Sequence, residues 1–152
     1  MFNEFKPSLL FLARFLGIYF AGNLLYGLYV ESFGDTADSI TYVVTKQTTA
    51  LLNFFGYDVD AVVNPQGPTV FMETSKKIAL SVYEGCNGVN VMVLFVAFVV
   101  AFGGPVRKMS WFVPLGLLII HFANLTRISL LFFVSEYYSR YFYYIHKYFF
   151  TA

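Results

Sequence analysis

Three long apolar stretches run along the chain, and a polar segment lies between the first and the second. The first stretch, residues 8–30, holds one charge, Arg14, close enough to its start for the side chain to reach the water interface. The second, 87–103, holds none, and the third, 110–134, holds only Arg127. Since about 20 apolar residues cross the hydrocarbon core of a bilayer, each stretch predicts a transmembrane helix.

The polar segment, residues 31–85, predicts structure outside the bilayer. Two runs of β-favouring residues, 59–63 and 69–72, flank a turn that contains prolines and a glycine. This arrangement predicts a small β-hairpin, with residues 78–83 as a third extended piece.

Earlier in the polar segment, residues 36–55 carry apolar positions at steps of three, four and seven. These steps suit one face of a helix, and Lys46 in the middle argues against a span. We expect an amphipathic helix on the membrane surface or on the bundle, capped by Asp35 or Thr36 and ended by Gly56. The expected apolar face consists of Ile40, Val43, Val44, Leu51, Leu52 and Phe55.

Composition indicates the same class of protein. The chain is 58% hydrophobic and 12% charged, whereas an average soluble domain has about 25% charged residues. Its mean hydropathy is +0.63, so a soluble fold would lack the polar residues to cover its surface. We expect one integral membrane domain over residues 1–152, mainly α: a helical bundle of about three to four transmembrane helices with an external amphipathic helix and a small β-hairpin. The aromatic tail, 136–152, is too short for a further span but suits the start of a fourth helix.

Charge and cysteine content exclude several other classes. The net charge is +1, and no basic cluster with interleaved aromatics predicts a nucleic-acid surface. The single cysteine, Cys86, excludes an intrachain disulfide and a Cys-rich metal site, and no cofactor is expected. A buried structural thiol, a reactive thiol and an intermolecular bridge all remain open for Cys86.

Basic residues near the span ends predict the orientation of the chain. The short turn with Arg107 and Lys108 contains no acid, so the positive-inside rule places it in the cytoplasm. Lys6 and Arg14 agree with a cytoplasmic N-terminus. The polar segment, 31–85, is then external, as is the end of the third span.

This orientation brings three reactive side chains to the outer face. Cys86 lies at the external start of the second span. Arg127 lies roughly 24 Å along the third span from Trp111, near the outer leaflet surface. His146 follows that span on the same side.

Cys86 and Arg127 each have a structural and a chemical interpretation. Free cysteines are usually buried for packing, but a thiol at a helix start has a lowered pKa, and Gly85 and Gly88 allow close backbone approach to Cys86. A charge within a span costs at least about 2.5 kcal/mol, which favours a functional role for Arg127 over simple extension to the interface. Asn124 lies three residues earlier on the same helical face.

The remaining candidates are less specific. His146 is the preferred partner of Cys86, because His121 lies about 9 Å deeper than Arg127 and on a different side of the helix, where packing or hydrogen bonding suits it. Glu84 is either a solvated charge or a helix N-terminal acid, and Asn87 has an amide able to donate to an oxyanion.

These motifs resemble the exosortase/archaeosortase family. The family has a Cys at the external start of one span, an Arg near the external end of the next, and a His or Arg shortly after. Here the matching residues are Glu84-Gly85-Cys86-Asn87-Gly88, then Asn124-Leu125-Thr126-Arg127-Ile128, then His146. The resemblance covers about residues 80–150 and fits the short forms, because typical members have more spans before the cysteine. They also carry a full helix at the third residue, so truncation after His146 stays open.

The resemblance implies a membrane cysteine transpeptidase in the bacterial cytoplasmic (inner) membrane, with its active site external. Its partners would be membrane-anchored proteins with a C-terminal sorting signal. Cys86 would be the nucleophile, His146 the acid–base partner and Arg127 the oxyanion stabiliser, with Asn87, Asn124 and Glu84 in support. The competing hypothesis is a non-catalytic membrane scaffold or assembly subunit, in which Arg127 pairs with an acid on a partner helix and Cys86 only packs.

Overall fold

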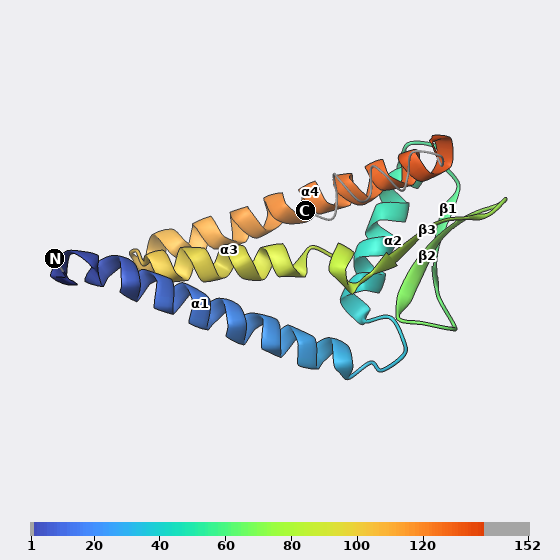
Figure 1. The fold of residues 1–152 in the computed structure, drawn as a ribbon. Helices are drawn as coiled ribbons and strands as arrows, with labels where there is room; N and C mark the ends of the chain where they lie inside the picture. Colours follow the sequence, from blue (N-terminus) through green and yellow to red (C-terminus); the bar gives the residue numbers. More distant parts are fainter. Residues whose placement is uncertain (1, 139–152) are drawn as a thin grey trace. The chain divides into compact units, whose positions relative to one another are not determined.

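The computed structural model describes residues 2–138, and from Phe5 onward also their side chains. Two helices come first along the chain, a small three-stranded sheet follows them, and a 3₁₀ turn leads into two more helices (Figure 1). The elements are α1 (Phe2–Glu31), α2 (Ser39–Phe54), β1 (Val59–Val63), β2 (Thr69–Thr74), β3 (Ile78–Tyr83), the 3₁₀ turn η1 (Glu84–Cys86), α3 (Val89–Phe102) and α4 (Val106–Tyr137).

The chain divides into two compact units. Within residues 2–138, the helical unit consists of the chain up to Ser32 together with Gly88–His121, and the sheet unit consists of Phe33–Asn87 together with α4 from Phe122 onward. Helix α4 contributes its first half to the helical unit and its second half to the sheet unit.

Aromatic rings and glycines let the helices of the helical unit pack closely. Phe11 of α1 meets Phe98 of α3 edge to face, with 5.7 Å between ring centroids, a favourable geometry for aromatic pairs. Gly116 of α4 leaves room for the Phe95 ring of α3, which a Cβ at that position would overlap. Ala97 of α3 is fully buried as well.

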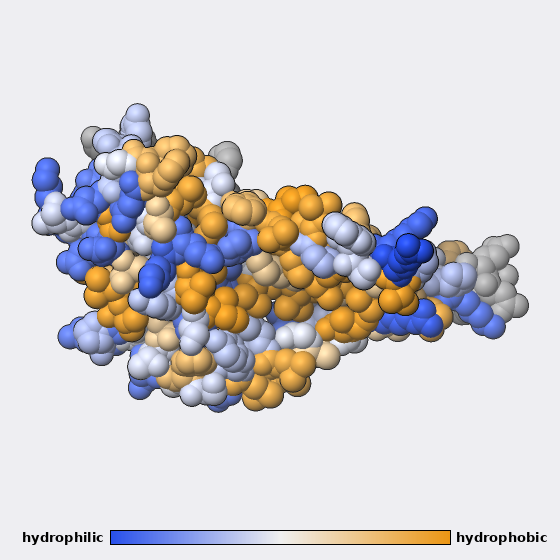
Figure 2. Space-filling view, turned by 180° about the vertical axis from the view of Figure 1, so that it is seen from behind, coloured by the Kyte–Doolittle hydropathy of each residue, from blue (hydrophilic) through white to orange (hydrophobic). Residues whose placement is uncertain are grey.

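Two helices within residues 2–138 are long and apolar enough to cross a membrane, Phe5–Glu31 and Val106–Tyr137. Helix α3 is apolar but has 14 residues, or about 21 Å at 1.5 Å per residue, against a hydrocarbon core of about 30 Å. Large apolar side chains stay exposed on the long helices, among them Leu25 at 68% and Trp111 at 81%. Figure 2 shows apolar side chains covering much of the helices on the face in view, as expected of a surface that meets lipid.

The sheet unit contains a three-stranded antiparallel meander in the order β1-β2-β3. The predicted hairpin is β1 and β2, paired from Val59 with Thr74 to Val63 with Val70. The expected third extended piece is β3, which pairs with β2 from Thr69 with Tyr83 onward. Strand β3 then leads directly into η1, so the sheet edge positions the turn that carries Cys86.

Helix α2 forms where predicted, and its buried face is the predicted one only in part: Val44 and Leu52 are buried, and Ile40 and Leu51 pack against the core. Asp38, and neither Asp35 nor Thr36, is the N-cap, and it accepts hydrogen bonds from the backbone N–H groups of Ile40 and Thr41. Val43 and Phe55 are exposed, and a threonine stripe is buried instead. The buried residues of α2 are Thr41, Val44, Thr45, Thr48, Thr49 and Leu52.

Burial of the threonines is possible because their hydroxyls are satisfied within the helix. Thr45 Oγ1 donates to the Thr41 carbonyl at 2.8 Å, and Thr48 Oγ1 donates to the Val44 carbonyl at 2.9 Å. A hydroxyl bonded to the carbonyl four residues earlier leaves only its methyl group to meet the core. Hydropathy alone counts these threonines as polar, which explains why they were not predicted to be buried.

The core of the sheet unit joins α2, the sheet and the second half of α4. Met72 of β2 is fully buried, as are Ile128 and Phe132 of α4 to within 1%. Ser135 of α4 donates a hydrogen bond to the Ala79 carbonyl of β3, so α4 is bonded to the sheet as well as packed on it. Cys86 belongs to the same buried cluster.

Candidate active site

Cys86 lies in a 3₁₀ turn between the sheet and α3. The turn η1 spans Glu84–Cys86, Asn87 is its C-cap, and Gly88 follows with φ of 84°. This left-handed conformation favours glycine, because a Cβ would be strained there. Helix α3 begins only at Val89, so the expectation that Cys86 opens a helix is wrong, and the pKa of its thiol is not lowered by a place in the first helical turn.

Two buried amides hold this turn in place. Asn124 of α4 donates from Nδ2 to the Cys86 carbonyl at 3.0 Å. Asn87 donates from Nδ2 to Thr41 Oγ1 of α2 at 3.1 Å, and that hydroxyl donates to Asp38 Oδ2 at 2.5 Å. All of these side chains are at most 6% exposed. The turn is therefore bonded to α4 on one side and to α2 on the other.

Asn87 has a different position from the one its predicted role requires. It was expected as a donor to an oxyanion, but it is 1% exposed and its amide donates to Thr41. A buried amide engaged in this way fixes the backbone next to Cys86.

Cys86 is buried, with 6% of its surface exposed. Burial is the largest influence on it and raises its pKa above the ordinary value, because the thiolate loses hydration. The positive charge of Arg127 and hydrogen bonds from the Tyr83 hydroxyl and backbone lower the pKa, while the negative charge of Glu84 raises it slightly. The net pKa is raised, so the resting thiol is protonated at neutral pH.

Tyr83 is the site residue that sequence reasoning missed. Its side chain hydrogen-bonds with the Cys86 thiol, and the nearby sulfur, more than burial, raises the pKa of the phenol. The ring lies against the backbone of Gly85, where an added Cβ would overlap it. The signal available in the sequence was an aromatic residue three positions before the only cysteine, with a glycine directly before that cysteine.

Arg127 lies on α4 three residues after Asn124, on the same face of that helix. It is half-buried, and its guanidinium acts electrostatically on both the Cys86 thiol and the Tyr83 phenol. The structure thus brings Cys86, Arg127, Asn124 and Glu84 together within the sheet unit. Asn124 and Arg127 have separate tasks there: one bonds the turn, and the other supplies charge.

The preference for His146 over His121 as the partner of Cys86 stays a prediction. His146 lies outside the described residues. His121 is a half-buried residue of α4 in the helical unit, whereas Cys86 belongs to the sheet unit. Within residues 2–138, no group of three or more His, Cys, Asp or Glu side chains is placed to hold a metal ion.

The arrangement combines a nucleophile, a cation and a hydrogen-bond donor around one sulfur. Such a group suits acyl transfer, in which a thiolate attacks a carbonyl and a positive charge stabilises the oxyanion. A search of curated proteins and a search of solved structures each found no match. A family model described as transmembrane exosortase (Exosortase_EpsH) matches residues 8–149, which is most of the chain. The chain therefore belongs to the transmembrane exosortase family and is a membrane protein.

Proposed function

We propose that the protein is a cysteine peptidase or transpeptidase that cleaves C-terminal sorting signals of exported proteins at the outer face of the bacterial cytoplasmic membrane. The observation that carries the proposal is the Cys86 thiol, with Arg127 and Tyr83 both acting on it, in a chain of the exosortase family. Substrates would be anchored by their own transmembrane helix, which would hold the scissile bond beside the site.

In the first step the Cys86 thiolate attacks the carbonyl carbon of the scissile peptide bond. A carbon–sulfur bond forms, and the carbonyl electron pair moves onto oxygen. Arg127 would stabilise this oxyanion, more strongly in a partly desolvated site than in water. The carbon–nitrogen bond then breaks, the amine leaves with a proton, and a thioester remains on Cys86.

His146 would take the thiol proton and return it to the leaving amine. In the second step an acceptor amine, another nucleophile or water attacks the thioester carbonyl. The acyl group passes to that acceptor, and the sulfur leaves as thiolate and recovers its proton. Tyr83, which hydrogen-bonds with the sulfur, would stabilise the thiolate at both points.

Because the pKa of Cys86 is raised, the thiol of the proposed site is protonated and unreactive in the absence of substrate. A buried, protonated thiol reacts slowly with small electrophiles. Substrate binding would have to expose the sulfur, and Arg127 and Tyr83 favour the thiolate once its proton is removed. We infer that activation accompanies substrate binding and is absent from the free enzyme.

One observation favours a second candidate function, a non-catalytic scaffold or assembly subunit. Cys86 is a member of the hydrophobic core, together with Val82, Leu125 and Ile128. Packing alone would account for a small apolar side chain at that place. The two functions make opposite predictions for Cys86→Ala, which preserves an apolar side chain of similar size but removes the nucleophile.

The test is processing of a co-expressed substrate that bears a C-terminal sorting signal. With wild type we expect cleavage, and with Cys86→Ala we expect none at equal protein level and equal membrane insertion. Arg127→Ala and His146→Ala run beside it, and Ser129→Ala serves as a control, because the Ser129 hydroxyl bonds to the Leu125 carbonyl of its own helix. Cleavage that persists in Cys86→Ala would contradict the proposed nucleophile and support the scaffold.

A further inference from the structure

An apolar groove lies in the helical unit, around the turn that joins α3 to α4. Its volume is about 1070 Å³, just above the range of about 300–1,000 Å³ typical of ligand pockets. Phe98 and Phe102 of α3 line it from one side, and Phe112 and Leu115 of α4 line it from the other. Phe102 is 75% exposed and Leu115 is 55% exposed, so much of this apolar lining is left open.

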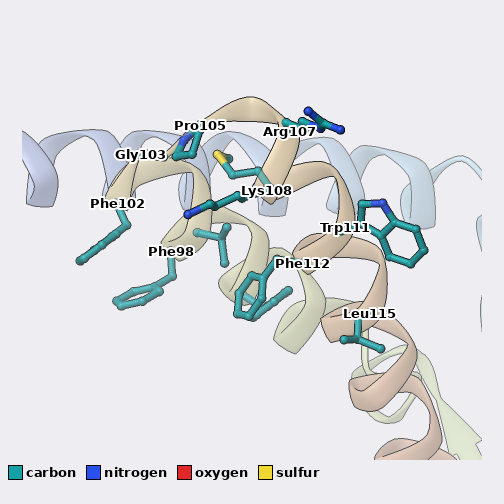
Figure 3. A pocket seen from close by; sticks show the side chains of 13 residues that line it. Phe98, Phe102, Gly103, Pro105, Arg107, Lys108, Trp111, Phe112 and Leu115 are labelled. Atoms are coloured by element: carbon teal, nitrogen blue, oxygen red, sulfur yellow. The ribbon is translucent and has the colours of Figure 1, made fainter.

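The charged residues of the groove are both basic. Arg107 and Lys108 line it at the turn, and its lining residues include no acid. Figure 3 shows Lys108 extending toward the side where Phe98 and Phe102 lie, whereas Arg107 and Trp111 extend the other way. The groove therefore joins an apolar channel to positive charge at one end.

We propose that this groove binds an anionic phospholipid. The phosphate would lie against Lys108, and Arg107 at the same turn would add positive charge near it. An acyl chain would lie along Phe98, Phe112 and Leu115. Charge complementarity carries the choice of ligand, because a neutral lipid or an apolar partner helix would leave both cations unused. Basic pockets between transmembrane helices on the cytoplasmic side are suited to anionic lipid headgroups, and the positive-inside rule places the Arg107–Lys108 turn on that side.

The proposal is independent of the proposed peptidase function, because the groove and Cys86 belong to different units. It also predicts how strongly anionic lipid should be preferred over zwitterionic lipid. A basic residue near an anionic headgroup contributes about a fivefold gain in lipid affinity. Two such residues therefore predict a preference for anionic over zwitterionic lipid of up to about 30-fold at low salt, decreasing as salt increases.

The chain supplies its own probe for this experiment. Trp111 is the only tryptophan, lines the groove and is 81% exposed. The full chain is reconstituted into phosphatidylcholine bilayers that contain equal mole fractions of either brominated phosphatidylglycerol or brominated phosphatidylcholine. Bromine quenches tryptophan fluorescence at short range, so the ratio of quenching by the two lipids reports the headgroup preference at the α3–α4 turn, where Trp111 lies.

We expect brominated phosphatidylglycerol to quench Trp111 several-fold more effectively. The double variant Arg107→Gln, Lys108→Gln should bring the ratio close to one. Lys6→Gln is the matched control, because it removes a cation expected on the same side of the membrane without touching the groove, and it should keep the wild-type ratio. Equal quenching by the two lipids in wild type, or a preference that survives the double variant, would overturn the proposal. Weak quenching by both lipids would also overturn it, since a protein segment would then cover Trp111.

Discussion

The side-chain amide of Asn124 donates a 3.0 Å hydrogen bond to the backbone carbonyl of Cys86, 38 residues earlier in the chain. The bond ties the turn that carries the cysteine to the helix that carries Arg127. Both groups are buried, so the bond is made away from competing water. The bond therefore fixes the backbone at Cys86 relative to the helix turn that carries Arg127, three residues after Asn124.

Asn124→Ala should destabilise the sheet unit and loosen the cysteine turn. The change leaves the buried Cys86 carbonyl without this donor, which costs about 1–3 kcal/mol. We expect a lower thermal unfolding temperature in detergent and faster alkylation of Cys86 in the native protein. Ser129→Ala is the control, because its buried hydroxyl bonds only to the Leu125 carbonyl of its own helix. Equal effects from the two variants would contradict the anchoring role of Asn124.

Thr41→Val should act on the same turn from the side of α2. The hydroxyl of Thr41 accepts from Asn87 and donates to Asp38, so its loss leaves two buried polar groups without that partner, at about 1–3 kcal/mol. Thr45→Val is a close control on the same helix face, since the Thr45 hydroxyl bonds to a carbonyl of its own helix. The measurement is the free energy of unfolding for both variants. If Thr45→Val lowers the free energy of unfolding as much as Thr41→Val does, the hydrogen bonds from Asn87 to Thr41 and from Thr41 to Asp38 do not specifically stabilise the turn.

How much of this site was predictable depends on the range of the forces involved. The helices and the hairpin followed from local signals, namely apolar runs and a Pro/Gly turn. Asn124 was predicted to share a helical face with Arg127, because helical spacing alone decides that. The threonine face of α2 was missed, because burial of Thr41 or Thr48 depends on where each hydroxyl finds an acceptor.

Tyr83 was missed for a different reason. Its role depends on the path of the backbone through η1, where Gly85 lets the ring fold back toward the sulfur. No periodicity in the sequence reports such a turn. The opposite error concerned the thiol itself: the apolar run after Cys86 suggested a helix start and a lowered pKa, whereas burial raises the pKa.

Tyr83→Phe should raise the pKa of the Cys86 thiol further. The hydroxyl hydrogen bond lowers that pKa, so its removal disfavours the thiolate and shifts the alkylation profile to higher pH. At a fixed pH below the pKa, we expect alkylation about two- to tenfold slower, the equivalent of one hydrogen bond. Tyr42→Phe, which removes a hydroxyl from the half-buried tyrosine of α2, should leave the profile unchanged.

Gly85→Ala offers an independent check on Tyr83. The added Cβ would overlap the Tyr83 ring, so the ring must move and its hydroxyl leaves the sulfur. The pH profile of alkylation should then shift in the same direction as in Tyr83→Phe, and adding Gly85→Ala to Tyr83→Phe should produce little further shift. A purely structural role for the ring would instead change the stability in both variants and leave the profile where it is.

Arg127 can be tested by separating its charge from its shape. Arg127→Gln removes the charge that lowers the pKa of Cys86, so the alkylation profile should move to higher pH. Arg127→Lys retains the charge but loses the planar five-donor guanidinium, so the profile should move less. If Arg127 stabilises the oxyanion, both variants should slow substrate processing, by about 100- to 1,000-fold for the glutamine.

The control for both Arg127 variants is Thr126→Ala. The neighbouring Thr126 is exposed and bonds only to the Phe122 carbonyl of its own helix, so neither alkylation nor processing should change. A lysine variant that processes substrate at the wild-type rate would show that a point charge suffices and that guanidinium geometry is not used. A glutamine variant with a normal alkylation profile but no processing would place the role of Arg127 on the oxyanion and not on the thiolate.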